Sequence, residues 1–123
     1  MAVDVITKSN KTNMNKTEAE YALVLEAMKR RGEILRYDYE GITLRWPVGD
    51  EIIKYTPDFL VFRKATAFTD DERILLVEIK GSFRKMPGIY ERAVERFRHA
   101  QTYWPEFSFE MLQKKLGEWV RIH

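Results

Sequence analysis

Two acidic residues and one lysine stand beside apolar segments in the middle of the chain. Asp58 precedes the apolar residues 59–62, and Glu78 and Lys80 close a second apolar segment. Successive side chains of a strand alternate between its faces, so Glu78 and Lys80 point the same way and Ile79 points the opposite way. If the two segments pair as strands, the carboxylates of Asp58 and Glu78 can approach each other.

Two close carboxylates repel each other, and a hard divalent cation relieves that repulsion. Mg²⁺ suits such a place because it takes oxygen ligands, keeps several waters and typically uses one or two carboxylates together with substrate phosphate. Lys80 could then hold or activate the attacking water and offset charge on a phosphorane-like transition state. The residue types and their spacing therefore indicate a Mg²⁺-dependent phosphodiesterase site.

Each piece also has a purely structural interpretation. The proline-aspartate pair can be a strand irregularity that leaves a solvated acid, and Glu78 and Lys80 can be an ion pair on an exposed strand. An acid-x-lysine triplet alone is a weak motif. The near-continuous apolar runs after Asp58 and before Glu78 are typical of strands buried on both faces. Charges at the ends of buried strands favour the chemical interpretation.

The two segments together resemble a known pattern. The letters T-P-D-F-L-V-F followed by L-L-V-E-I-K-G are similar to the motif of the PD-(D/E)XK nuclease superfamily, especially its small phage and prophage members related to Holliday-junction resolvases. By this resemblance, Asp58 and Glu78 correspond to the metal-binding acids. The backbone carbonyl of Ile79 corresponds to a frequent extra metal ligand, and Lys80 corresponds to the motif lysine.

The resemblance implies an α/β fold with a restriction-endonuclease-like core. A mixed sheet of four to six strands would be flanked by helices, the first helix on one face and a later basic helix on the other. The implied activity is Mg²⁺-dependent endonucleolytic hydrolysis of DNA, with Mn²⁺ as a substitute metal and branched or junction DNA as candidate substrates. It also implies a cytoplasmic protein encoded by a phage or prophage. Junction resolution would require two sites and hence a homodimer.

Family members also carry a glutamate on the first helix, and two residues here compete for that place. At about 100° per residue, Glu18 and Glu20 flank the apolar arc of the helix on its two sides, so periodicity does not decide between them. Thr17 and Glu20 match a capping box, with Thr17 as N-cap and Glu20 at N3. That pairing occupies Glu20, and we therefore favour Glu18 as the catalytic-helix glutamate.

Composition is consistent with one compact domain. A chain of 123 residues can bury a real core but is too short for two domains, and three Trp, six Tyr and seven Phe argue against disorder. The absence of cysteine excludes disulfides, thiolate zinc sites and a cysteine nucleophile, and two histidines exclude a multi-histidine cluster. No apolar stretch approaches the roughly 20 residues that cross a membrane, and we expect a cytosolic protein.

Charge is unevenly distributed along the chain. Residues 1–78 hold 12 Lys/Arg against 14 Asp/Glu, whereas residues 79–123 hold 9 against 5. The excess of basic residues predicts phosphate contacts from four of them, Arg84, Lys85, Arg92 and Arg96. An ordinary solvated helix face with Glu-Arg pairs remains the alternative for the two on the helix.

Apolar periodicity, glycines and prolines predict the elements that position these residues. We expect helices at 17–31, with Gly32 as the residue that ends it, and at 89–103. Expected strands are 33–40 and 42–46 as an antiparallel meander, 52–62 and 73–80 at the site, and a hairpin of 107–112 and 118–122, with a short helix at 110–116 as the alternative. Residues 66–73 and 82–88 should be loops, and residues 1–14 a flexible lead-in to a single domain at 15–123.

Two other functions compete with the nuclease. A catalytically inactive nucleic-acid-binding or assembly protein of the same fold would bind DNA without needing a metal. A plain protein-interaction domain would bind neither metal nor DNA. The presence of both acids together with the lysine favours catalysis, because an inactive descendant has no chemical need for them.

Overall fold

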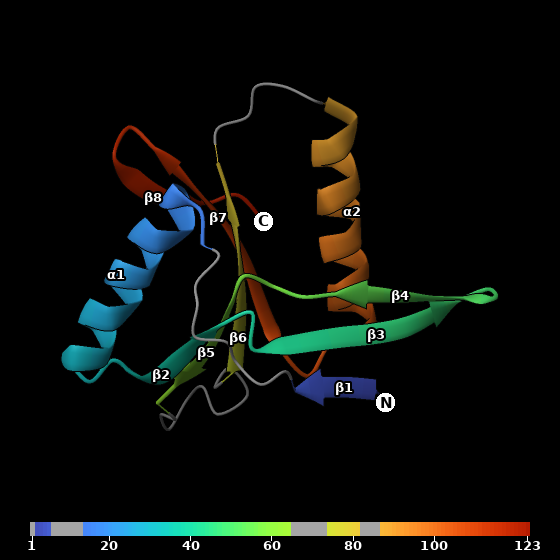
Figure 1. The fold of residues 1–123 in the computed structure, drawn as a ribbon, viewed down its shortest axis with the longest axis horizontal. Coiled ribbons are helices and arrows are strands. Elements are labelled where there is room, and N and C mark those ends of the chain that lie inside the picture. The colour runs from blue at the N-terminus through green and yellow to red at the C-terminus, as the bar shows by residue number, and fades with distance from the viewer. Residues whose placement is uncertain (1, 6–13, 65–73, 82–86) are drawn as a thin grey trace.

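The computed structural model describes residues 2–5, 14–64, 74–81 and 87–123 (Figure 1). Within these ranges the chain forms two helices and eight strands, arranged in two sheets. The elements are β1 (Ala2–Val5), α1 (Lys16–Arg30), β2 (Ile34–Tyr39), β3 (Ile42–Val48), β4 (Glu51–Tyr55), β5 (Phe59–Arg63), β6 (Ile74–Lys80), α2 (Pro87–Tyr103), β7 (Ser108–Lys115) and β8 (Glu118–Arg121).

The larger sheet has five strands in the order β2-β5-β6-β7-β8. Only the β6–β7 pair is parallel, and α2 makes the crossover between these two strands, as a parallel connection requires. The other pairs of this sheet are antiparallel. The predicted α/β fold with a mixed sheet of four to six strands is therefore confirmed at this level.

The two helices lie on opposite faces of this sheet (Figure 1), as expected from the sequence. On the α1 side, Leu25 packs with Phe59 and Val77. On the α2 side, Phe97 packs with Leu76 and with residues of β3, β4 and β7. Alternate residues of β6 thus enter different cores, which is why its apolar run is nearly continuous.

The smaller sheet has the order β1-β3-β4 and lies on the α2 side of the larger one (Figure 1). The expected meander of residues 33–40 with 42–46 is wrong. β2 pairs with β5 in the large sheet, and β3 pairs with β4 and β1 in the small one. The chain changes sheets at Glu40, which has a φ of 53°, and at Gly41, where a Cβ atom would lie 2.8 Å from the Cβ of Asp38. The two residues between β2 and β3 therefore carry the chain from the large sheet to the small one, and the two strands do not pair with each other.

The expected single strand at 52–62 is also wrong, because residues 56–58 interrupt it. β4 ends at Tyr55 in the small sheet and β5 begins at Phe59 in the large one. Pro57, which is fully buried, has no N–H to donate to a strand ladder and is therefore disfavoured within a central strand. The break leaves Asp58 directly before the first residue of β5.

Helix α1 begins one residue earlier than expected and uses a different capping box. Asn15 is the N-cap: its side chain accepts a hydrogen bond from the N–H of Glu18, and the Glu18 carboxylate accepts one from the N–H of Asn15. The predicted pairing of Thr17 with Glu20 is wrong, because an asparagine two residues upstream supplies an equally good cap. The helix ends as predicted at Gly32, whose φ is 80°.

The C-terminal hairpin predicted from the sequence is confirmed as β7 and β8, and the short helix at 110–116 is excluded. The turn contains Leu116 and Gly117, with φ values of 51° and 81°. Residues 2–5 of the expected flexible lead-in form β1, and its residues 6–13 lie outside the described part. The expected loop at 66–73 and residues 82–86 of the next one also lie outside it.

Candidate functional site

The site is centred where β5 begins and β6 continues beyond it. The register pairs Phe59 with Val77, so by extension Asp58 faces Glu78 across the two strands. The paired residues of β5 and β6 end at Phe59 and Val77, and beyond them Oδ2 of Asp58 accepts a hydrogen bond from the N–H of Ile79 at 2.7 Å. Asp58 is 9% exposed, so its carboxylate is held inside the protein.

Glu78 and Lys80 point to the same face of β6, as alternation predicts. The Nζ atom of Lys80 lies 3.2 Å from Oε2 of Glu78, and their side chains are 20% and 14% exposed. Leu76, on the same face, belongs to the core beneath α2. The Glu78–Lys80 pair therefore continues that core outward, and an ion pair on an exposed strand does not describe it.

The electrostatic state of Asp58 is unusual for an aspartate. Burial and the nearby Glu78 charge raise the pKa of Asp58 from 3.8 to about 8, and Glu18 adds to the effect. The Ile79 N–H and the Lys80 charge act in the opposite direction but do not cancel it. Two carboxylates thus lie close together in a partly desolvated site, where both cannot easily be ionised. A bound cation would relieve this repulsion.

Glu18 and Glu20 have different surroundings. Glu18 lies near enough to Asp58 to raise its pKa, and its Oε1 accepts a hydrogen bond from the hydroxyl of Tyr39 at 2.9 Å. Glu20 instead forms an ion pair with Lys114, with an N–O distance of 3.0 Å. The structure thus places Glu18 beside the site, although it is Glu18 that takes part in the capping box.

Two tyrosines that the sequence analysis did not single out donate hydrogen bonds to the carboxylates of Glu78 and Glu18. Tyr55 donates its hydroxyl to Oε1 of Glu78 at 2.8 Å, and Tyr39 makes the corresponding bond to Glu18. Burial, together with these carboxylates, raises the pKa of both tyrosines, so they remain neutral donors. The available signal was that a buried tyrosine hydroxyl usually needs a partner.

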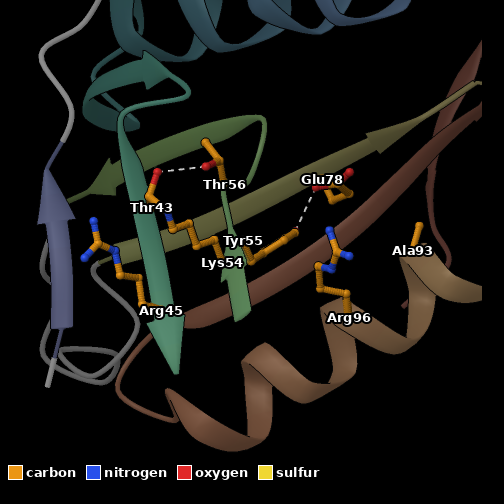
Figure 2. A pocket seen from close by; sticks show the side chains of 8 residues that line it. All are labelled: Thr43, Arg45, Lys54, Tyr55, Thr56, Glu78, Ala93 and Arg96. Carbon is orange, nitrogen blue, oxygen red and sulfur yellow. Dashed lines mark hydrogen bonds between the residues drawn. The ribbon is translucent and has the colours of Figure 1, made fainter. Parts of the chain in front are cut away.

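A hollow of about 640 Å³ opens beside Glu78, between the β3–β4 hairpin and α2 (Figure 2). Figure 2 shows Tyr55 reaching Glu78 from β4 and Arg96 pointing from α2 toward the same carboxylate. The Arg96 charge opposes the rise in the pKa of Tyr55, but burial and the Glu78 charge outweigh it. The hollow is lined by Thr43, Arg45, Lys54, Tyr55, Thr56, Glu78, Ala93 and Arg96.

The predicted phosphate-binding residues fall in different places. Arg96 is exposed and lines the hollow, and Arg92 is exposed on the same helix. Arg84 and Lys85 lie outside the described residues. Arg45 and Lys54, which also line the hollow, were not predicted, because phosphate contacts were expected only from the basic residues after Glu78.

The site offers carboxylate oxygens, which are the ligands that a hard divalent cation takes. In the described part of the chain, no group of three or more His, Cys, Asp or Glu residues could hold a metal ion. Asp58 and Glu78 supply two carboxylates, and Mg²⁺ commonly uses only one or two of these, completed by waters and substrate phosphate. The residues present therefore fit a magnesium ion with few protein ligands and do not fit an enclosed all-protein site.

Comparisons of this chain with models of protein families, with curated proteins and with solved structures found no match. Any functional conclusion therefore depends on the residues and geometry of the site itself. Neither α1 nor α2 in the described part of the chain is long and apolar enough to cross a membrane.

Proposed function

We propose that this protein is a Mg²⁺-dependent deoxyribonuclease of the PD-(D/E)XK type, with a restriction-endonuclease-like core and with DNA as its substrate. The observation that carries the proposal is that Asp58, just before β5, lies beside Glu78 at the end of β6, with Lys80 on the same face as Glu78.

The fold supports the proposal in one specific respect. An acid just before β5 and an acid-x-lysine triplet at the end of its antiparallel neighbour β6 bring three charged residues to one end of two interior strands. A protein that used these strands only for stability would gain nothing from this. Burying two like charges together raises the free energy of the folded state unless something compensates for it.

The metal would be held by Asp58, Glu78 and the backbone carbonyl of Ile79. In an extended strand the N–H and C=O of one residue point to the same side, so the carbonyl of Ile79 faces the side on which Asp58 accepts its N–H bond. When bound, Mg²⁺ would supply Lewis acidity at a phosphate oxygen and charge neutralisation.

The remaining chemistry falls to the side chains of the site. Water attacks phosphorus, one P–O ester bond breaks, and the products are a phosphate monoester, an alcohol and a released proton. Lys80, as an ammonium, would hold the attacking water and offset the negative charge that grows on the phosphate oxygens. Tyr55 keeps Oε1 of Glu78 oriented, while Oε2 faces Lys80. Glu18, held by Tyr39, would support the water structure around the site.

The test is a cleavage panel of junction, flap, duplex and single-stranded DNA, with Mg²⁺ and with EDTA. The wild type should cut at least one of these forms with Mg²⁺ only, and Asp58→Ala and Lys80→Ala should each lose at least 100-fold in rate. A wild type that cuts none of them would overturn the proposal, as would unchanged cleavage by both variants. Metal-independent DNA binding without cleavage would instead support the inactive DNA-binding protein.

A further inference from the structure

We propose that the hollow between the β3–β4 hairpin and α2 is a groove that binds the sugar-phosphate backbone of a single nucleic-acid strand and leads it to Glu78. The inference rests on the proposed function, because it is that function which makes Glu78 the place where the bond is cut. It adds the region of substrate contact and the form of the nucleic acid, neither of which the motif residues specify.

The charges that line the groove favour a polyanion. Three of its lining residues are cations, namely Arg45, Lys54 and Arg96, and one is an acid, Glu78. Glu78 is already engaged by Lys80 and Tyr55. Lys54 and Arg96 are both exposed, and neither has a hydrogen-bonding or ion-pair partner among the residues that the structure describes. Their charges are therefore available to a ligand.

The register of the hairpin strengthens this interpretation. Arg45 and Lys54 stand directly opposite each other on β3 and β4. Like charges in a cross-strand pair destabilise a hairpin. A phosphate group near the two side chains would lower that cost, so this pair of cations favours an anionic ligand.

A second cross-strand pair continues the same face of the hairpin toward the residues that lead into β5. Thr43 and Thr56 lie opposite each other, and their hydroxyl oxygens are 2.8 Å apart (Figure 2). Each hydroxyl can both donate and accept, so one of them can turn to a phosphate oxygen. A row of two hydroxyls and two cations along one hairpin face is suited to successive groups of a phosphodiester backbone.

The groove has walls that are fixed in the folded protein. The ring of Trp46 on β3 stacks on that of Tyr103 on α2, with centroids 6.2 Å apart and planes inclined by 25°. Trp46 and Tyr55 are both buried in the core that includes Phe97 of α2. The hairpin and the helix are therefore held together by apolar contacts, and the groove does not need a ligand in order to form.

The size of the groove distinguishes a single strand from a duplex. A volume of about 640 Å³ lies in the range of pockets that enclose small ligands, roughly 300–1,000 Å³, and so admits about one or two nucleotides. A duplex is wider than a hollow of this size and would have to lie across its opening. We therefore expect an unpaired segment, such as a flap or a frayed end, to occupy it.

The experiment is fluorescence anisotropy in EDTA, with a labelled oligonucleotide of about ten nucleotides and with the same sequence as a duplex. The test protein is Lys54→Ala/Arg96→Ala, and the matched control is Arg98→Ala, an exposed arginine on the same helix. We expect the double variant to bind the single strand at least tenfold more weakly. Its salt slope should fall by about 1.4, which is two contacts at roughly 0.7 each.

The control should bind like the wild type, and Lys54→Arg/Arg96→Lys should recover most of the affinity, which excludes a folding defect. Unchanged binding by the double variant would overturn the groove, as would a wild type that prefers the duplex or binds neither form. Cleavage is not part of this assay, so the two proposals fail separately. A wild type that binds the strand as expected but never cuts DNA would refute the nuclease and leave the groove intact.

Discussion

Replacing Asp58 with asparagine should remove a carboxyl group whose ionised form is unfavourable in the folded protein without metal. The folded protein holds the pKa of Asp58 at about 8, because the carboxylate is buried beside Glu78, whereas the ordinary value is 3.8. Between these two values the folded state keeps a proton that the unfolded state has lost. Stability must therefore fall as the pH rises through this window. Asparagine has the same shape, can still accept the N–H of Ile79 through its carbonyl oxygen, and has no charge to bury.

The size of the effect follows from linkage. One proton held only by the folded state costs about 1.4 kcal/mol of unfolding free energy for each unit of pH. From about pH 5 to about pH 7 the wild type should thus lose about 2.5 kcal/mol through Asp58. Asp58→Asn should lack this contribution, so its stability relative to the wild type should rise by that amount across the same interval.

Urea denaturation at several pH values in EDTA measures the difference, and repetition with Mg²⁺ adds a second readout. A site that binds Mg²⁺ only when folded stabilises the wild type by about 1.4 kcal/mol when the metal is at ten times its Kd. Asp58→Asn should gain little, and it should be inactive although it is at least as stable near neutral pH. If the stability of the two proteins changed with pH in parallel, the raised pKa of Asp58 would be refuted. Equal stabilisation of both proteins by Mg²⁺ would refute the role of Asp58 as a metal ligand.

Two further substitutions test the packing around the site. Tyr55→Phe removes the donor to Oε1 of Glu78, and we expect Mg²⁺ affinity or activity to fall roughly 10- to 100-fold; cleavage measured against Mg²⁺ concentration checks this, and an unchanged titration curve would contradict it. Gly41→Ala should cost about 1–3 kcal/mol, because the new Cβ would meet the Cβ of Asp38 at 2.8 Å. Gly81→Ala is the matched control, since its Cβ would meet nothing within 4 Å, and it should change stability by less than about 1 kcal/mol; equal urea midpoints for the two alanine variants would show that the close approach is not real.

Local patterns were sufficient for the helices, the C-terminal hairpin and the strand that carries Glu78 and Lys80. Alternation along one strand fixes the relative direction of Glu78 and Lys80, because it depends only on backbone geometry. Gly32 marks the end of α1 in the same local way, since a glycine readily adopts the positive φ that the turn requires. These features involve residues only a few positions apart, so the sequence itself contains the relevant information.

The strand order was harder to predict, because alternating segments reveal which face is apolar and not which neighbour each strand chooses. β2 and β3 are separated by two residues and alternate in the same way, yet they belong to different sheets. The buried Pro57 divides what looked like one strand, and its effect depends on the two sheets that meet there. The choice between Asn15 and Thr17 as N-cap was similarly open, since both residues cap helices well.

The sequence by itself determined which residues carry the charges of the site: an acid at 58, and an acid and a lysine two residues apart on one face of a strand. Only the tertiary structure brought Asp58 to the N–H of Ile79, held Glu78 by Tyr55, and turned Arg96 of α2 toward the same carboxylate (Figure 2). The physical reason is that these contacts join residues far apart in the chain. Register, sheet order and the packing of α2 fix their distances, and none of these is expressed in a local spacing.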